Sequence, residues 1–169
     1  MKIDDSATAL RRMILAICLL LTPVTAFSAA AEHSVNHSEG MTLVGAPLAI
    51  HGYDPVAFFT DGEARLGDAQ YSVAHGGVAY RFVSEENRKM FEQNPSRYLP
   101  QYGGFCAYGV ALGAKFDGDP RVFAVRDGKL FFNLSRQIQK TWEEDLDGNI
   151  RQADDNWSKI RDAAPASLK

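Results

Sequence analysis

An apolar run near the N-terminus decides how much of this chain is available to fold. Arg11 and Arg12 precede MILAICLLLTPVTA at residues 13–26, and small residues follow at 28–31. A charged segment, an apolar stretch of this length and an A-x-A-like end are the pattern of a secretory signal peptide. We therefore expect a signal peptide over residues 1–31, cleavage after Ala31, and a mature protein that is periplasmic or secreted.

The expected mature chain contains one cysteine. Cys18 lies in the leader and leaves with it, so Cys106 keeps no intrachain partner. Exported proteins meet an oxidising compartment, where an unpaired cysteine suggests intermolecular pairing, a metal or a reactive thiol. The remaining length suits one ordinary domain.

Charge and hydropathy exclude two classes of partner. The full chain has 18 basic residues (Lys and Arg) and 21 acidic residues (Asp and Glu). The leader contains three of the basic and two of the acidic residues, so the mature chain keeps 15 basic and 19 acidic residues. A mature chain with a net charge near −4 and no basic stripe is not expected to bind nucleic acid. The one long apolar run is part of the leader, so we expect no stable membrane insertion after its removal.

Two hairpins stand out in the ordered part of the chain. Asp127-Gly128 lies between Arg121–Arg126 and Lys129–Asn133, and this dipeptide favours a type I′ turn. His75-Gly76-Gly77 similarly separates strands expected over 70–74 and 78–83.

Helices are expected after each hairpin. Ser84 can cap a helix that begins at Glu85. Apolar residues recur at helical spacing from Ile138 to Ile160, with a break at Asp147-Gly148. The fold class is therefore α+β: a small antiparallel sheet of β-hairpins with packed helices, in a single domain, without internal repeats.

We divide the chain into four segments. They are a signal peptide (residues 1–31), a flexible N-terminal segment (32–45), one domain (46–162) and a C-terminal tail (163–169).

Several motifs together carry a resemblance to a known family. They are GYDPVAFF at 52–59, YRF at 80–82, SEENRKMFEQNPSRYLPQYGGFCAYGVA at 84–111, DGKLFFN at 127–133 and the spacing of Trp142 and Trp157. Over nearly all of residues 50–160 the chain resembles the exported YHS-domain proteins of bacteria. The resemblance implies a metal-binding module, because related YHS and TRASH-like domains accompany heavy-metal handling proteins. It also implies a thiol used either for chemistry or for soft-metal ligation, since some exported members carry selenocysteine at the position of Cys106.

The chain departs from the small metal-binding modules of that kind in its single cysteine. Those modules often have more than one, so a closed multi-thiolate site within one monomer is excluded here. The resemblance supplies no reaction that can be transferred to this chain.

Cys106 is the first candidate for a functional site. If Gly104 caps a helix over residues 105–112, the thiol lies in its first turn, facing unpaired N–H groups. That placement lowers the pKa of a thiol below about 8.5. The alternative is a small buried hydrophobe, because free cysteine is often fully buried.

Further ligands would have to come from elsewhere in the sequence. His75 and His51 are candidate imidazole ligands, and Asp54 is a candidate carboxylate ligand whose alternative is an Asx-turn. One thiolate with one or two imidazoles suits copper or zinc. Three tyrosines could contact a bound group or could simply pack in the core: Tyr53, Tyr102 and Tyr108.

Three functions follow from these residues. The favoured one is an exported protein that binds a soft, copper-like metal ion at Cys106, for sequestration or transfer, with a metal- or thiol-handling partner and a possible homodimer. The second is a thiol redox protein in which Cys106 is the reacting group. The third is a non-catalytic interaction module with a buried structural cysteine. No catalytic group is assigned, and a non-enzymatic role is expected over an enzymatic one.

Overall fold

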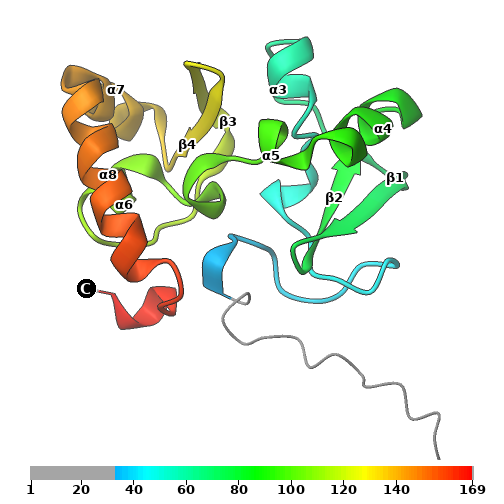
Figure 1. Ribbon diagram of the computed structural model, residues 1–169, viewed down its shortest axis with the longest axis horizontal. Coiled ribbons are helices and arrows are strands. Elements are labelled where there is room, and N and C mark those ends of the chain that lie inside the picture. Colours follow the sequence, from blue (N-terminus) through cyan, green and yellow to red (C-terminus); the bar gives the residue numbers. More distant parts are fainter. Residues whose placement is uncertain (1–32, 169) are drawn as a thin grey trace, which may run out of the picture.

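Two β-hairpins form the framework, and each makes its own two-stranded antiparallel sheet (Figure 1). β1 (Asp68–His75) pairs with β2 (Val78–Phe82), and β3 (Asp119–Arg126) pairs with β4 (Lys129–Asn133). Asp127 and Gly128 have φ angles of 50° and 71°, as the expected type I′ turn requires. This computed structural model describes residues 33–168, so the expected signal peptide lies outside the described residues.

Each hairpin is followed by a helix with a serine cap. Ser84 Oγ accepts a hydrogen bond from the N–H of Asn87 at 3.2 Å and caps α4 (Glu85–Gln93). Ser135 Oγ does the same for Ile138 at 3.3 Å and caps α7 (Arg136–Glu144). The other elements are α3 (Ala57–Thr60), α5 (Pro95–Tyr98), α6 (Ala107–Ala111), α8 (Leu146–Ile160) and the 3₁₀ turns η1 (Ile50–Gly52), η2 (Gln101–Gly104) and η3 (Pro165–Ser167). Within residues 33–168, none of the helices has the length and apolar character needed to cross a membrane.

The break between the last two helices lies earlier than expected. Asp145 separates α7 from α8, and its carboxylate accepts the N–H of Gly148 at 3.1 Å. Asp145 is thus the cap of α8, and the expected break at Asp147-Gly148 is wrong, because both residues belong to the first turn of that helix. A Cβ on residue 148 would collide with the Asp145 carboxylate, so the turn requires glycine.

Strand β4 lies between two hydrophobic cores and contributes to both. Leu130 and Phe132 belong to the core that includes Phe58, whose ring centroid is 5.3 Å from that of Phe132. Phe131 belongs to the other core, and its centroid is 5.4 Å from that of Trp142. Because successive side chains of a strand point to opposite faces, one short strand joins the two cores. The expected single-domain α+β fold is confirmed.

The two halves of the molecule repeat one arrangement. A 3₁₀ turn, a short helix, a hairpin and a capped helix occur in both, as η1–α3–β1–β2–α4 and η2–α6–β3–β4–α7. Hairpin partners Asp68 and Phe82 correspond to Asp119 and Asn133, a shift of 51 positions at each, and both ladders have the same register irregularity. The expectation of no internal repeat is therefore wrong. Side chains at matching positions differ enough to hide the repeat in the sequence.

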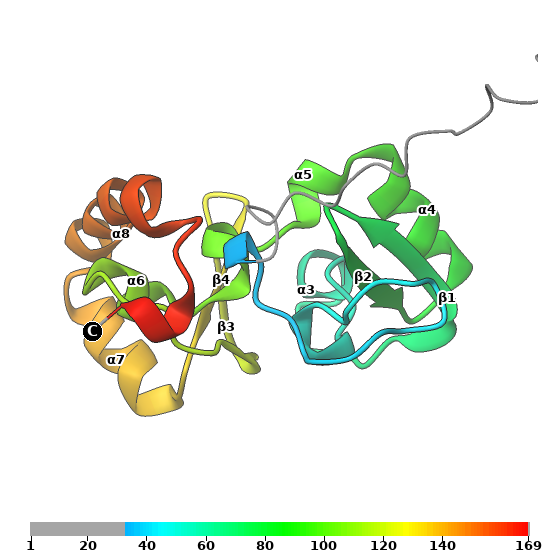
Figure 2. The same cartoon turned by 90° about the horizontal axis from the view of Figure 1, so that it is seen from below.

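The segment before the first 3₁₀ turn runs across both halves (Figure 2). Asn36 N–H donates to Gly103 O at 2.9 Å, and Ser38 N–H donates to Leu48 O at 2.8 Å. The ammonium of Lys115 donates to the carbonyls of His33 and Ala163, both at 2.8 Å. The sequence predicts a flexible N-terminal segment and a C-terminal tail here, and the described parts of both make these hydrogen bonds.

Truncating the shared strand tests whether the two cores unfold together. Leu130 is fully buried, so Leu130→Ala is expected to lower the free energy of unfolding by about 2–5 kcal/mol. Urea unfolding followed by far-UV circular dichroism and by tryptophan fluorescence should give one coincident transition for wild type and variant. Lys129→Ala, at the exposed end of the same strand, is the control. Separate transitions by the two probes would contradict a joined core.

Candidate functional site

Cys106 lies at the start of α6 with 1% of its surface exposed. Gly103 and Gly104 precede it with φ angles of 61° and 86°, in a tight turn that few other residues could adopt. Cys106 is itself the N-cap, because its sulfur accepts the N–H of Gly109. The expected cap at Gly104, with the cysteine inside the first turn, is wrong.

The sulfur has polar neighbours on several sides. It accepts the N–H groups of Gly109 and Leu134, both at 3.4 Å. It donates its proton to Asn133 Oδ1 at 3.6 Å, and that oxygen also accepts the N–H of Tyr108 at 3.3 Å. Cys106 therefore ties the start of α6 to the end of β4.

Burial dominates the ionisation of this thiol. Loss of water contact raises the pKa of Cys106, and the backbone N–H groups of Gly109, Leu134 and Tyr108 oppose that rise without overcoming it. The expected lowering of the pKa is contradicted, because a five-residue helix offers less stabilisation to a thiolate than the removal of water costs.

Asp54 occupies the matching position in the first half. Its Oδ1 accepts the N–H groups of Val56 and Ala57 at 2.7 and 3.3 Å. Its Oδ2 accepts the N–H of Val83 at 2.8 Å and the amide of Asn87 at 2.7 Å. Asp54 is fully buried, and its bond to the N–H of Val56 forms the Asx-turn given above as the alternative, while its other oxygen ties the start of α3 to the residue after β2. Its donors leave it little capacity to bind a metal.

Neither candidate histidine bonds to the thiol, although His51 lines the same surface hollow as Leu134, whose N–H contacts the sulfur. His75 is at the exposed tip of the first hairpin, edge-on to Phe91 at a centroid distance of 5.6 Å. His51 Nε2 is 2.9 Å from Asp117 Oδ1, and the pair is well exposed. Across residues 33–168, no three His, Cys, Asp or Glu side chains converge in a way that could hold a metal ion.

The three tyrosines are dispersed as well. Tyr53 lies beside His51 and Arg121 in a surface hollow of about 370 Å³. Tyr108 packs against the second core. Tyr102 is buried, and its hydroxyl donates to Asp154 Oδ1 at 2.9 Å.

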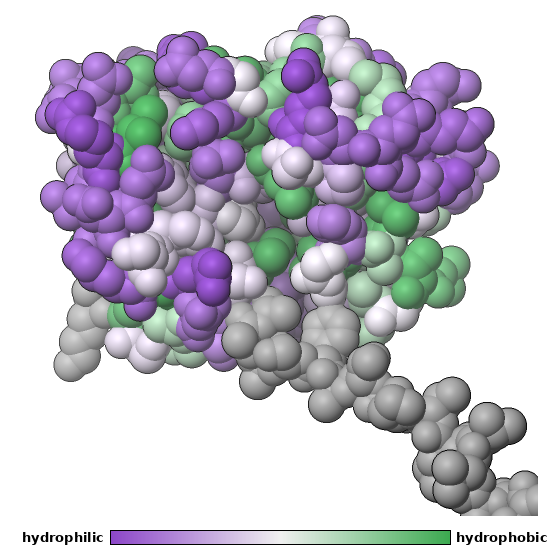
Figure 3. Space-filling view, in the orientation of Figure 1, coloured by the Kyte–Doolittle hydropathy of each residue, from purple (hydrophilic) through white to green (hydrophobic). Residues whose placement is uncertain are grey.

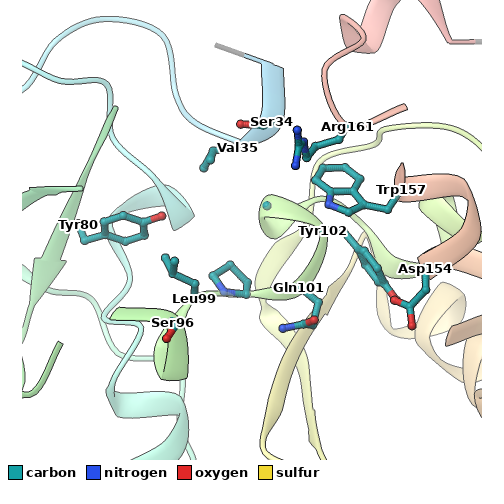
Figure 4. Close-up of a pocket in the computed structure, with 12 residues that line it drawn as sticks. Ser34, Val35, Tyr80, Ser96, Leu99, Gln101, Tyr102, Asp154, Trp157 and Arg161 are labelled. Atoms are coloured by element: carbon teal, nitrogen blue, oxygen red, sulfur yellow. The ribbon is translucent and has the colours of Figure 1, made fainter. Parts of the chain in front are cut away.

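A cleft between the two halves is a candidate site that the sequence did not predict. The face seen in Figure 3 is hollowed between the halves, and a cavity of about 390 Å³ lies there. Its lining comes from the N-terminal segment, β2, the α5–η2 connection and α8. The residues drawn in Figure 4 include Val35, Tyr80, Leu99, Tyr102, Asp154, Trp157 and Arg161. No local motif connects these segments, so only the tertiary structure reveals the cleft.

Tyr80 gives the cleft an unusual polar group. The residue is 2% exposed, yet its hydroxyl points into the cleft (Figure 4) and bonds to no described residue. Burial raises the pKa of Tyr80, and burial followed by the Asp154 hydrogen bond raises the pKa of Tyr102. Both phenols are therefore protonated at neutral pH.

Scans against protein-family models, curated proteins and solved structures gave no significant match to this chain.

The ionisation of Cys106 predicts a loss of stability at alkaline pH. Because its folded pKa is raised, the folded chain keeps a proton that the unfolded chain loses above about pH 8.5. The contribution of Cys106 to stability is thus fully present below that pH and declines as the pH approaches the folded pKa. Urea unfolding of reduced wild type and Cys106→Ala should show the wild-type advantage shrinking between about pH 7 and pH 10. An advantage that grows with pH would mean a stabilised thiolate.

Proposed function

We propose that this protein is a non-catalytic binding module whose ligand site is the cleft between its two halves. It is further proposed to act outside the cytoplasm, as the leader-like N-terminus and the resemblance to exported YHS-domain proteins suggest. In this proposal Cys106 is a structural residue in the resting protein: it caps α6 and holds the end of β4.

The observation that carries the proposal is the hydroxyl of Tyr80. Its oxygen is not among the buried side-chain atoms without a partner in the described part of the chain, so it is reached by solvent from the cleft. A tyrosine that is 2% exposed, with its hydroxyl unpaired among the described residues and open to a cavity, is placed to donate to a molecule from solution. Ligand sites commonly combine such a polar group with apolar and aromatic walls.

The other groups in the cleft restrict the class of ligand. Trp157, Leu99 and Val35 supply apolar surface. Asp154 and Arg161 contribute one charge of each sign, and Arg161 is also paired with Asp162 at 3.1 Å. A neutral or zwitterionic organic molecule with a hydrogen-bond acceptor for Tyr80 and an apolar body fits this balance.

Removing the Tyr80 hydroxyl tests the site directly. A set of neutral and zwitterionic aromatic fragments, screened by protein-observed NMR, should shift the indole N–H signal of Trp157, which lines the cleft. The signal of Trp142, fully buried in the second core, is the internal control. Tyr80→Phe is expected to weaken fragment binding about 2–10-fold, the usual value of one hydrogen bond.

A matched variant separates this effect from a general change in the first core. Tyr71 packs against the same core but does not line the cleft, so Tyr71→Phe should leave fragment affinity unchanged. Fragments that shift only residues around His51 and Arg121 would move the site to the other hollow and overturn the proposal.

Soft-metal binding at Cys106 stays a prediction. No set of three such ligands converges among residues 33–168. A Cu(I) competition titration of reduced protein beside Cys106→Ala decides it. If the prediction is right, the wild type binds the ion tightly and the variant does not, and the stoichiometry shows whether two chains share one ion. Equal weak binding by both proteins would exclude a cysteine-centred site.

A further inference from the structure

The internal repeat gives Cys106 a counterpart in the first half of the molecule. That counterpart is Asp54, whose side chain is an anion. Asp54 N–H donates to Arg65 O at 2.8 Å, and Cys106 N–H donates to Phe116 O at 2.9 Å. Each residue comes directly after a bridge to the loop that leads into its hairpin, and each precedes a short helix. The carboxylate of Asp54 and the sulfur of Cys106 therefore occupy equivalent places in the fold.

The donors around the two groups correspond one to one along the backbone. In the first half, the carboxylate accepts the N–H groups of Val56, Ala57 and Val83, and the amide of Asn87. The matching backbone groups in the second half are those of Tyr108, Gly109 and Leu134. An amide also lies beside the sulfur, that of Asn133 from a different position in the chain, and in the reduced site its Oδ1 accepts the S–H group.

The side chain of Asn133, next to Cys106, has a hydrogen-bond donor without a partner among the described residues. The residue is fully buried, its Oδ1 lies 3.6 Å from the sulfur, and its Nδ2 has no hydrogen-bond partner among the described residues. An unpaired buried amide is rare in native proteins. The sulfur accepts two N–H groups, whereas the two carboxylate oxygens of Asp54 together accept four donors.

We propose that Cys106 is a modification site at which a hydroperoxide forms a sulfinate, and that the N–H groups around it then hold the sulfinate as Asp54 is held. A cysteine sulfinate has the same connectivity as an aspartate side chain, two oxygens on one atom attached to Cβ. The modification therefore converts the second site into a copy of the first.

The chemistry needs two equivalents of hydroperoxide. In the first step the sulfur attacks the peroxide, an S–O bond forms as the O–O bond breaks, and the thiol and peroxide become a sulfenic acid and an alcohol or water. In the second step the sulfenate sulfur takes an oxygen from another peroxide and becomes the sulfinate, again releasing an alcohol or water. Cys106 is the only cysteine within residues 33–168, so no second thiol in that part of the chain intercepts the sulfenate.

A half-turn of the Asn133 amide completes the new hydrogen bonds. In the reduced site Oδ1 faces the S–H group and Tyr108 N–H. Exchanging Oδ1 and Nδ2 turns the unpaired Nδ2 toward the sulfinate and frees Tyr108 N–H to donate to it. The change needs no movement of the backbone.

Leu134 contacts the sulfur and also reaches the protein surface. Its N–H lies 3.4 Å from the sulfur, and the residue is 47% exposed. Leu134 lines two surface hollows, one with His51 and Arg121 and the other with Ser135 and Arg136. Burial, which raises the pKa of Cys106, makes the reaction slow at neutral pH and faster as the pH rises.

Hydrogen peroxide titration of the reduced, folded chain tests the proposal. Peptide mapping by mass spectrometry is expected to place a gain of about 32 Da, two oxygens, on Cys106. Mapping is needed because Met41 and Met90 are exposed and also oxidise. The oxidised protein should melt at the same temperature as the reduced protein or higher. Unfolding on oxidation, or a Cys106 that stays a thiol until the protein unfolds, would overturn the proposal.

Two variants report on the donors themselves. Asn133→Asp keeps the shape of the side chain but replaces Nδ2 with an oxygen that repels a sulfinate, so sulfinate formation should slow at least tenfold. Cys106→Asp places the carboxylate of the first half in the second and should be at least as stable as Cys106→Ala. A less stable Cys106→Asp together with unchanged oxidation of Asn133→Asp would show that the donors do not hold an anion. Neither test involves the cleft, so failure here leaves the proposed function unaffected.

Discussion

Burial of β4 on both faces is the interaction on which the rest of the structure depends. Leu130 and Phe132 pack into one core and Phe131 into the other, so the two halves cannot separate without exposing a strand that has no solvent face. The cleft exists because the halves are fixed in this way. Tyr80 belongs to the first half and Trp157 to the second, and their separation is set by cores that share one strand.

The same backbone solution recurs at the junction of each hairpin with its short helix. A side chain that accepts hydrogen bonds must stand where the helix begins, because N–H groups from the helix and from the end of the second strand converge there. Asp54 meets this need with a carboxylate and Cys106 with a sulfur. The lone thiol behind two glycines is thus explained first by local structure. The proposed oxidation of that thiol rests on the match between the donors around Cys106 and those around the carboxylate of Asp54.

Local signals predicted the elements well. Ser84 and Ser135 cap their helices and Asp127-Gly128 makes its turn, because caps and tight turns depend on residues a few positions apart. Predictions about the candidate site, which depend on residues far apart in the sequence, were less successful. The pKa of Cys106 is raised rather than lowered because of burial, and Cys106 lies against β4, which comes later in the chain. His51 and His75 were grouped with the thiol only by residue type.

The sequence by itself determined the α+β class, the positions of the hairpins and helices, and the presence of one thiol in a glycine-bound turn, because each rests on backbone preferences within a few residues. Only the tertiary structure decided that Cys106 is buried, that it matches Asp54 in an internal repeat, and that Tyr80 faces Trp157 across a cleft. The repeat keeps residues that the backbone requires, such as Gly77 and Gly128, while its core side chains have changed. Packing fixes those side chains in space, and no short pattern in the sequence records it.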